Sequence, residues 1–220
     1  MMIRSLVVLL LVGLAPAVLA NKFDDYKVES VEALADAKVP EAVRKALDTK
    51  GLRLVDDKGK QVCEIWFAKS IPTSSAEVQG ANYAKIAEGA LVGVINFKSD
   101  AVDFRGQALK TGFYTLRYGL ILQDGNHLGV SEARDFLLAS PVAEDKDPAL
   151  QAKTEDLFKI SRLATGTGHP SVWSMVPVNS TDGLPKAVKN EHEHVILETK
   201  IPTKSGELAI GLILIGKTEG

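Results

Sequence analysis

Short segments of strand character, separated by turns, are the feature that most constrains how this chain can fold. In residues 113–122 the apolar and aromatic side chains alternate onto one face, as expected for a strand with one buried side. Residues 208–215 are apolar on both faces, which is typical of a strand in the centre of a sheet. Further strands are expected at 52–55, 61–68, 91–97, 136–138, 171–176 and 194–201.

Two segments have helical spacing instead. Residues 40–48 begin with Pro40, which suits the first helical position, and Gly51 stands where a C-terminal cap belongs. Residues 148–163 follow the helix start Asp147-Pro148 and repeat apolar residues at helical spacing. Residues 21–39 are polar and weakly patterned. About eight strands with no regular strand–helix alternation predict a mainly β fold, an antiparallel β-sandwich of immunoglobulin-like or jelly-roll-like type with two short helices.

The first twenty residues have the layout of a secretory signal peptide. Arg4 precedes the unbroken apolar run 5–14, Pro16 follows it, and Val18 and Ala20 occupy the −3 and −1 positions of a cleavage site. The run is shorter than the roughly 20 residues of a bilayer span, so cleavage after Ala20 is expected. The domain organisation is therefore a signal peptide, 1–20, and one β domain, 21–220, exported to the periplasm or the cell exterior, with no stable membrane insertion.

Composition limits the partners of the exported domain. The formal net charge is −2 for the full chain and −3 once residues 1–20, with Arg4, are removed, which gives no reason to expect nucleic acid. The single cysteine, Cys63, excludes an intramolecular disulfide, and its place in an alternating strand predicts a buried core thiol.

One stretch of the chain resembles segments of known proteins. The run Lys110–Tyr118 (KTGFYTLRY), followed by Asp124-Gly125-Asn126-His127, is similar to segments of uncharacterised exported bacterial proteins. The resemblance covers the middle third of the chain. It implies a β-sandwich and an envelope or secreted location, and it brings no activity with it.

The polar loop 124–135 is the first candidate site. Counted from Asp124, it partly matches a calcium-binding loop, with Asn126 at position 3 and Asp135 at position 12, but Leu128 at position 5 cannot bind a cation. A second interpretation is a small polar binding site; its candidate residues are Asp124, Asn126, His127, Arg134 and Asp135. The third is a solvated loop held by local hydrogen bonds.

Two further segments carry histidines. His169 lies in the glycine-rich turn 165–170, which is interpreted as a rigid start of a strand; a functional role requires His169 to meet His127 in space. His192, His194 and Glu198 have the H-x-H-x3-E spacing of a cupin metal site. The alternation predicts instead that Val195, Leu197, Thr199 and Ile201 face the core and that the two histidines face solvent.

These observations leave two functional hypotheses. The first is a non-catalytic secreted or periplasmic module that binds a glycan, a peptide or an envelope protein through an exposed aromatic patch, for which Trp66 and Trp173 are the candidates. The second is a small hydrolase-like or metal-dependent enzyme that uses loop 124–135 with His169. No cofactor is predicted; calcium is the one ion considered.

Overall fold

Alternation of inward and outward side chains builds one large antiparallel sheet. The computed structural model describes residues 26–121, 131 and 133–218. Ten strands follow one another in the order β1-β2-β3-β4-β7-β8-β9-β12-β11-β10, and every neighbouring pair is antiparallel. Their bounds are β1 Tyr26–Glu32, β2 Lys50–Asp56, β3 Gln61–Phe67, β4 Leu91–Phe97, β7 Gly112–Leu120, β8 Asp135–Pro141, β9 Ser171–Val176, β12 Gly206–Ile215, β11 Val195–Thr203 and β10 Lys186–Lys189.

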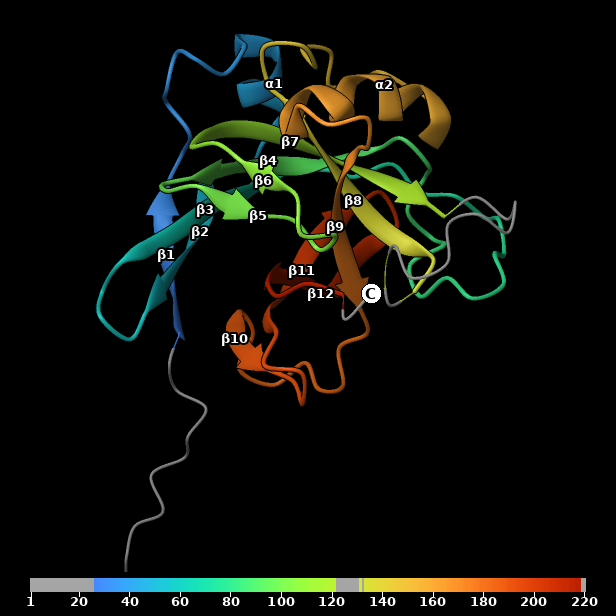
Figure 1. The fold of residues 1–220 in the computed structure, drawn as a ribbon. Helices are drawn as coiled ribbons and strands as arrows, with labels where there is room; N and C mark the ends of the chain where they lie inside the picture. Colours follow the sequence, from blue (N-terminus) through green and yellow to red (C-terminus); the bar gives the residue numbers. More distant parts are fainter. Residues whose placement is uncertain (1–25, 122–130, 132, 219–220) are drawn as a thin grey trace, which may run out of the picture.

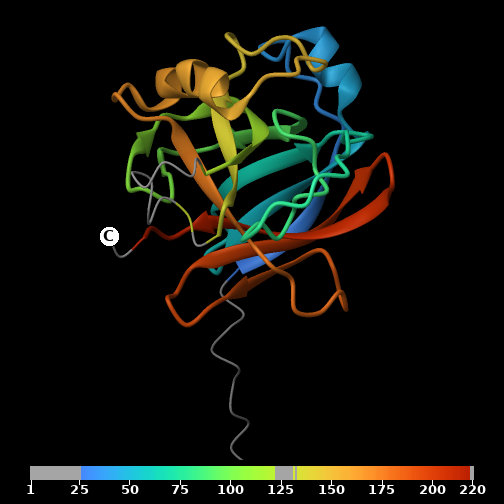
Figure 2. The same ribbon diagram turned by 90° about the vertical axis from the view of Figure 1, so that its right-hand side faces the viewer.

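The sheet curls until its two edge strands meet, so that it forms a nearly closed barrel (Figures 1 and 2). At the seam, the Lys189 ammonium of β10 lies 5.8 Å from the centroid of the Tyr26 ring of β1. The prediction of a mainly β, antiparallel fold with two helices is confirmed. The predicted two-layer sandwich differs from what is observed, because β8 and β9 hydrogen-bond to each other and join all ten strands into one sheet.

Both helices pack on the outside of the barrel (Figure 1). Helix α1 (Glu41–Ala46) covers Trp66, and helix α2 (Thr154–Thr165) covers the outward side chains of β8 and β9, among them Leu138. Gly51 is not the helix cap that was predicted. It lies in β2, where a Cβ atom would stand 2.6 Å from the Trp66 ring.

Helix α2 begins at Thr154, six residues after the predicted start at Pro148. The intervening segment is held by a buried arginine. Arg117 of β7 donates hydrogen bonds to the carbonyl oxygens of Asp147 (2.6 Å) and Leu150 (3.1 Å). Glu88 then accepts from the Thr154 amide at 2.8 Å, so the first turn of α2 is capped from outside the helix.

The inward side chains fill the barrel. They come from nearly every strand, with Trp173 and Tyr118 among the largest. The inward face predicted for β11 is confirmed for Val195, Leu197 and Ile201. Cys63 is buried as predicted, and burial raises the pKa of its thiol to about 12.

The two ends of the barrel are covered differently. We call the end at which β7 begins the mouth end, and the end at which β7 finishes the loop end. At the loop end, the segment 68–90 inserts Ile71, Tyr83 and Ile86 into the core. At the mouth end, a small hairpin of β5 (Ala101–Val102) and β6 (Ala108–Leu109) leans over the opening. Among the described residues, no helix is long and apolar enough to cross a membrane.

Candidate functional site

Arg134 and Asp135, the predicted polar residues that the structure describes in loop 124–135, stabilise the loop end. Asp135 is fully buried and accepts hydrogen bonds from the Tyr118 hydroxyl (2.6 Å), the Tyr83 amide (3.0 Å) and the Asn82 amide. Arg134 donates to the carbonyl oxygens of Gln79 and Ile121, at 3.0 Å each. Both side chains therefore tie the segment 79–83 and the end of β7 together. Asp124, Asn126 and His127 lie outside the described residues. Most positions of the calcium-binding loop considered above therefore lie outside them too.

His169 does not meet Arg134 or Asp135. Ala139 of β8 pairs with Ser171 of β9, so His169 lies near the end of β8 while Asp135 begins it. Six residues of extended strand separate the two positions, roughly 20 Å. The His169 ring is exposed, and its carbonyl oxygen accepts a hydrogen bond from the Thr165 hydroxyl at 2.8 Å, consistent with the structural interpretation of this turn.

The histidine pair lies in the turn before β11 and not on the strand. His194 is buried: its Nδ1 lies 3.3 Å from the Asn190 amide nitrogen, and its Nε2 lies 3.1 Å from the Lys217 carbonyl oxygen. The prediction that this ring faces solvent was wrong, because the chain continues beyond the end of β12 and Gly216 and Lys217 pack against the imidazole. Glu198 faces outward and pairs with Lys186 at 3.3 Å. Across the described part of the chain, no three His, Cys, Asp or Glu side chains gather as a metal site would require.

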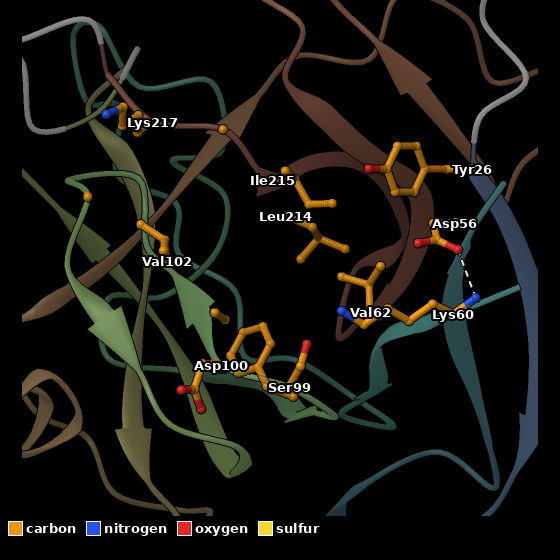
Figure 3. Close-up of a pocket in the computed structure, with 14 residues that line it drawn as sticks. Tyr26, Asp56, Lys60, Val62, Ser99, Asp100, Val102, Leu214, Ile215 and Lys217 are labelled. Atoms are coloured by element: carbon orange, nitrogen blue, oxygen red, sulfur yellow. Dashed lines mark hydrogen bonds between the residues drawn. The ribbon is translucent and has the colours of Figure 1, made fainter. Parts of the chain in front are cut away.

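A cavity of about 660 Å³ opens at the mouth end (Figure 3). Its wall is mostly apolar and comes from strand ends that are far apart in the sequence. The lining residues are Tyr26, Asp56, Lys60, Val62, Phe97, Ser99, Asp100, Ala101, Val102, Gly106, Leu214, Ile215, Gly216 and Lys217. Because β7 begins here at Gly112 and its last residue, Leu120, pairs with Asp135 at the other end of the barrel, Asp135 lies about 26 Å from this end.

The floor of the cavity is an aromatic stack. Phe97 is buried, and its ring centroid lies 4.9 Å from that of Trp173 at an interplanar angle of 25°. The Phe97 ring also contacts the Tyr114 ring, and their centroids lie 5.9 Å apart. Both tryptophans are buried, so neither forms the exposed aromatic patch that was expected. Trp173 instead supports the cavity from below.

The hairpin that forms one side of the cavity is fixed by a buried carboxylate. Asp103 accepts hydrogen bonds from the amides of Arg105 (3.0 Å) and Gln107 (2.8 Å) within the hairpin and from Val172 of β9 (3.0 Å). Burial raises the pKa of Asp103, although these donors act in the opposite direction. The hairpin is thus tied to the barrel wall, and Val102, with 50% of its surface exposed, stands on the rim of the cavity.

The charged residues of the cavity stand at its edge. Figure 3 places Asp56 and Lys60 on one side and Lys217 on the other, with Val62, Leu214 and Ile215 between them. The Asp56 carboxylate accepts hydrogen bonds from the backbone amides of Lys58 (3.0 Å) and Lys60 (2.7 Å), which closes the β2–β3 turn. The cavity is therefore apolar inside and polar at its opening.

Comparisons with protein-family models, with curated proteins and with solved structures found no match to this chain. The cavity was not predicted, because its wall assembles from four separate segments of the chain, at residue 26 and in 56–62, 97–106 and 214–217. The one sequence signal for it is the apolar pair Ala101-Val102 in a stretch that is otherwise polar, from Lys98 to Asp103.

Proposed function

We propose that the mature chain is an exported, non-catalytic binding module that takes up a small apolar ligand at the mouth of its barrel. The observation that carries this proposal is the apolar cavity with an exposed valine on its rim. Its volume of about 660 Å³ lies within the range of roughly 300–1,000 Å³ that ligand pockets occupy. The mouth of a barrel is one of the places where such pockets occur.

The chemistry of the lining supports binding rather than catalysis. Among the described lining residues there is no histidine or cysteine, and Ser99 is the one hydroxyl besides Tyr26. A nucleophile with an adjacent base is therefore lacking in this wall. A glycan is a weaker candidate than an apolar molecule, because both tryptophans are buried and offer no flat platform to a sugar ring.

Export is proposed on the N-terminal sequence. The apolar run 5–14, followed by small residues at −3 and −1, is the signal for secretion. A module that carries or senses an apolar compound in the periplasm or outside the cell needs no catalytic group.

The experiment is a titration of residues 21–220 with N-phenyl-1-naphthylamine, which fluoresces in apolar sites. We expect saturable binding. A ligand that covers the exposed half of Val102 gains about 1 kcal/mol from it, so Val102→Ser is expected to raise Kd about fivefold.

Leu163→Ser is the matched control. Leu163 and Val102 are the two large apolar residues that are exposed in the described part of the chain, and Leu163 lies on α2, away from the cavity. The control is expected to bind as the unchanged protein does. No saturable binding, or equal weakening by the two substitutions, would contradict the proposal.

A further inference from the structure

The rim of the mouth cavity carries no net charge. It holds two carboxylates, Asp56 and Asp100, and two ammonium groups, Lys60 and Lys217. None of the four makes an ion pair with a described residue. Two charges of each sign around one opening largely cancel for a group placed at its centre. The rim therefore does not select a cation or an anion.

The hydrophobic side chains that are most deeply buried in the described wall of the cavity are Phe97 and Leu214, exposed by 2% and 4%. In the described part of the chain, the one buried side-chain polar atom without a hydrogen bond is Nε of Arg134, at the loop end. A charged ligand group placed against Phe97 and Leu214 would lose hydration and meet no opposite charge on these two buried side chains, which is costly.

From these two observations we infer that the mouth cavity selects uncharged apolar molecules, alkyl or aromatic, over their charged analogues. The inference rests on the proposed function and names the ligand class of the same site. The ligand lies on the Phe97 ring, against Val62 and Leu214, and its exposed edge is covered by Val102 of the hairpin. Any polar end of the ligand reaches the opening, where Ser99 and Tyr26 offer uncharged hydroxyl groups.

Two probes with the same ring system test the ligand class. N-phenyl-1-naphthylamine is neutral, and 8-anilinonaphthalene-1-sulfonate adds one negative charge. Both are titrated into residues 21–220 at the same ionic strength, and binding is followed by calorimetry so that quantum yields do not enter. We expect the neutral probe to bind at least tenfold more tightly. A ratio below tenfold overturns the inference while leaving the binding site in place. Absence of binding by both probes overturns the proposed function itself.

Charge reversal at the rim provides an independent test. Lys60→Glu makes the rim negative and Asp100→Lys makes it positive. At low ionic strength each substitution is expected to shift the Kd of the sulfonate about threefold, in opposite directions, and to leave the neutral probe within about twofold.

Lys159→Glu is the matched control for net charge. Lys159 lies on α2, outside the barrel, and its side chain is 75% exposed. This control is expected to leave both probes unchanged. If it shifts sulfonate binding as much as Lys60→Glu does, the overall charge and not the rim governs discrimination, and the inference is overturned.

Discussion

The buried ion pair between Arg117 and Asp145 gives the sharpest prediction about stability. The guanidinium is 1% exposed, and each of its five N–H groups donates one hydrogen bond. Two reach Asp145, at 2.6 and 2.8 Å, and the others reach the carbonyl oxygens of Gly89, Asp147 and Leu150. One side chain thus anchors the segments on both sides of β7 and the approach to α2.

Asp145→Ala leaves the guanidinium charge buried and two of its N–H groups without an acceptor. Removing one partner of a buried pair costs about 3–5 kcal/mol, and we expect that loss in the free energy of unfolding. Arg117→Met leaves the Asp145 carboxylate with the Thr115 hydroxyl at 2.6 Å, and leaves three carbonyl oxygens without this donor. We expect a loss of similar size from it.

The double variant, Arg117→Met with Asp145→Ala, distinguishes the interaction between the two charges from the loss of packing at each site. With both charges removed, no uncompensated ion stays in the core, so the double variant is expected to lose about as much as either single variant. The coupling free energy then equals one single loss, about 3–5 kcal/mol. Urea unfolding of residues 21–220, followed by tryptophan fluorescence, gives the three values. If the two single losses add up to the loss of the double variant within about 0.5 kcal/mol, Arg117 and Asp145 do not act as a coupled pair.

Three further predictions concern a thiol, a carboxylate and the N-terminus. Burial raises the pKa of Cys63 to about 12, so the native protein should not react with a disulfide reagent at pH 8, whereas urea-unfolded protein should react fully; fast reaction of the native protein would contradict the burial. Burial alone would raise the pKa of Glu64, but hydrogen bonds from Lys98 and Arg53 outweigh it and hold the pKa below the unfolded value of 4.5. The stabilisation is therefore present above pH 4.5 and is lost as the pH falls through the folded pKa, so the difference in stability between the unchanged protein and Glu64→Gln should shrink in acid; a difference independent of pH would count against this pair. Protein exported by a bacterial host should begin at Asn21 by N-terminal sequencing, and an intact N-terminus on the exported chain would rule out the predicted cleavage.

Much of the strand pattern could be predicted from the sequence, because alternation is a local property. The bounds of β4 and β9 were predicted to the residue, and the central place of β12 between β9 and β11 is confirmed. Strand β1 was missed, because an edge strand with exposed charged residues lacks an apolar face of sufficient length. The predicted start of α2 was wrong, because Arg117, distant in the sequence, binds the carbonyl oxygens of Asp147 and Leu150.

Closure of the sheet and formation of the cavity depend on long-range pairing. Whether β8 pairs with β9, and whether β1 meets β10, is decided by the twist of the whole sheet and leaves no local mark. The role of Asp135 also depends on long-range contacts. The sequence predicted it as a binding residue of loop 124–135, but its carboxylate is buried and accepts hydrogen bonds from the Tyr83 amide and the Tyr118 hydroxyl. Polar sequence alone does not distinguish such a structural carboxylate from a binding one.

Ligand binding at the mouth cavity is best tested by a crystal structure of residues 21–220 with N-phenyl-1-naphthylamine bound. We expect one molecule of the probe in the mouth cavity, in contact with Phe97, Val62 and Leu214 and covering Val102. Probe bound elsewhere, with the mouth cavity empty at saturating concentration, would contradict it.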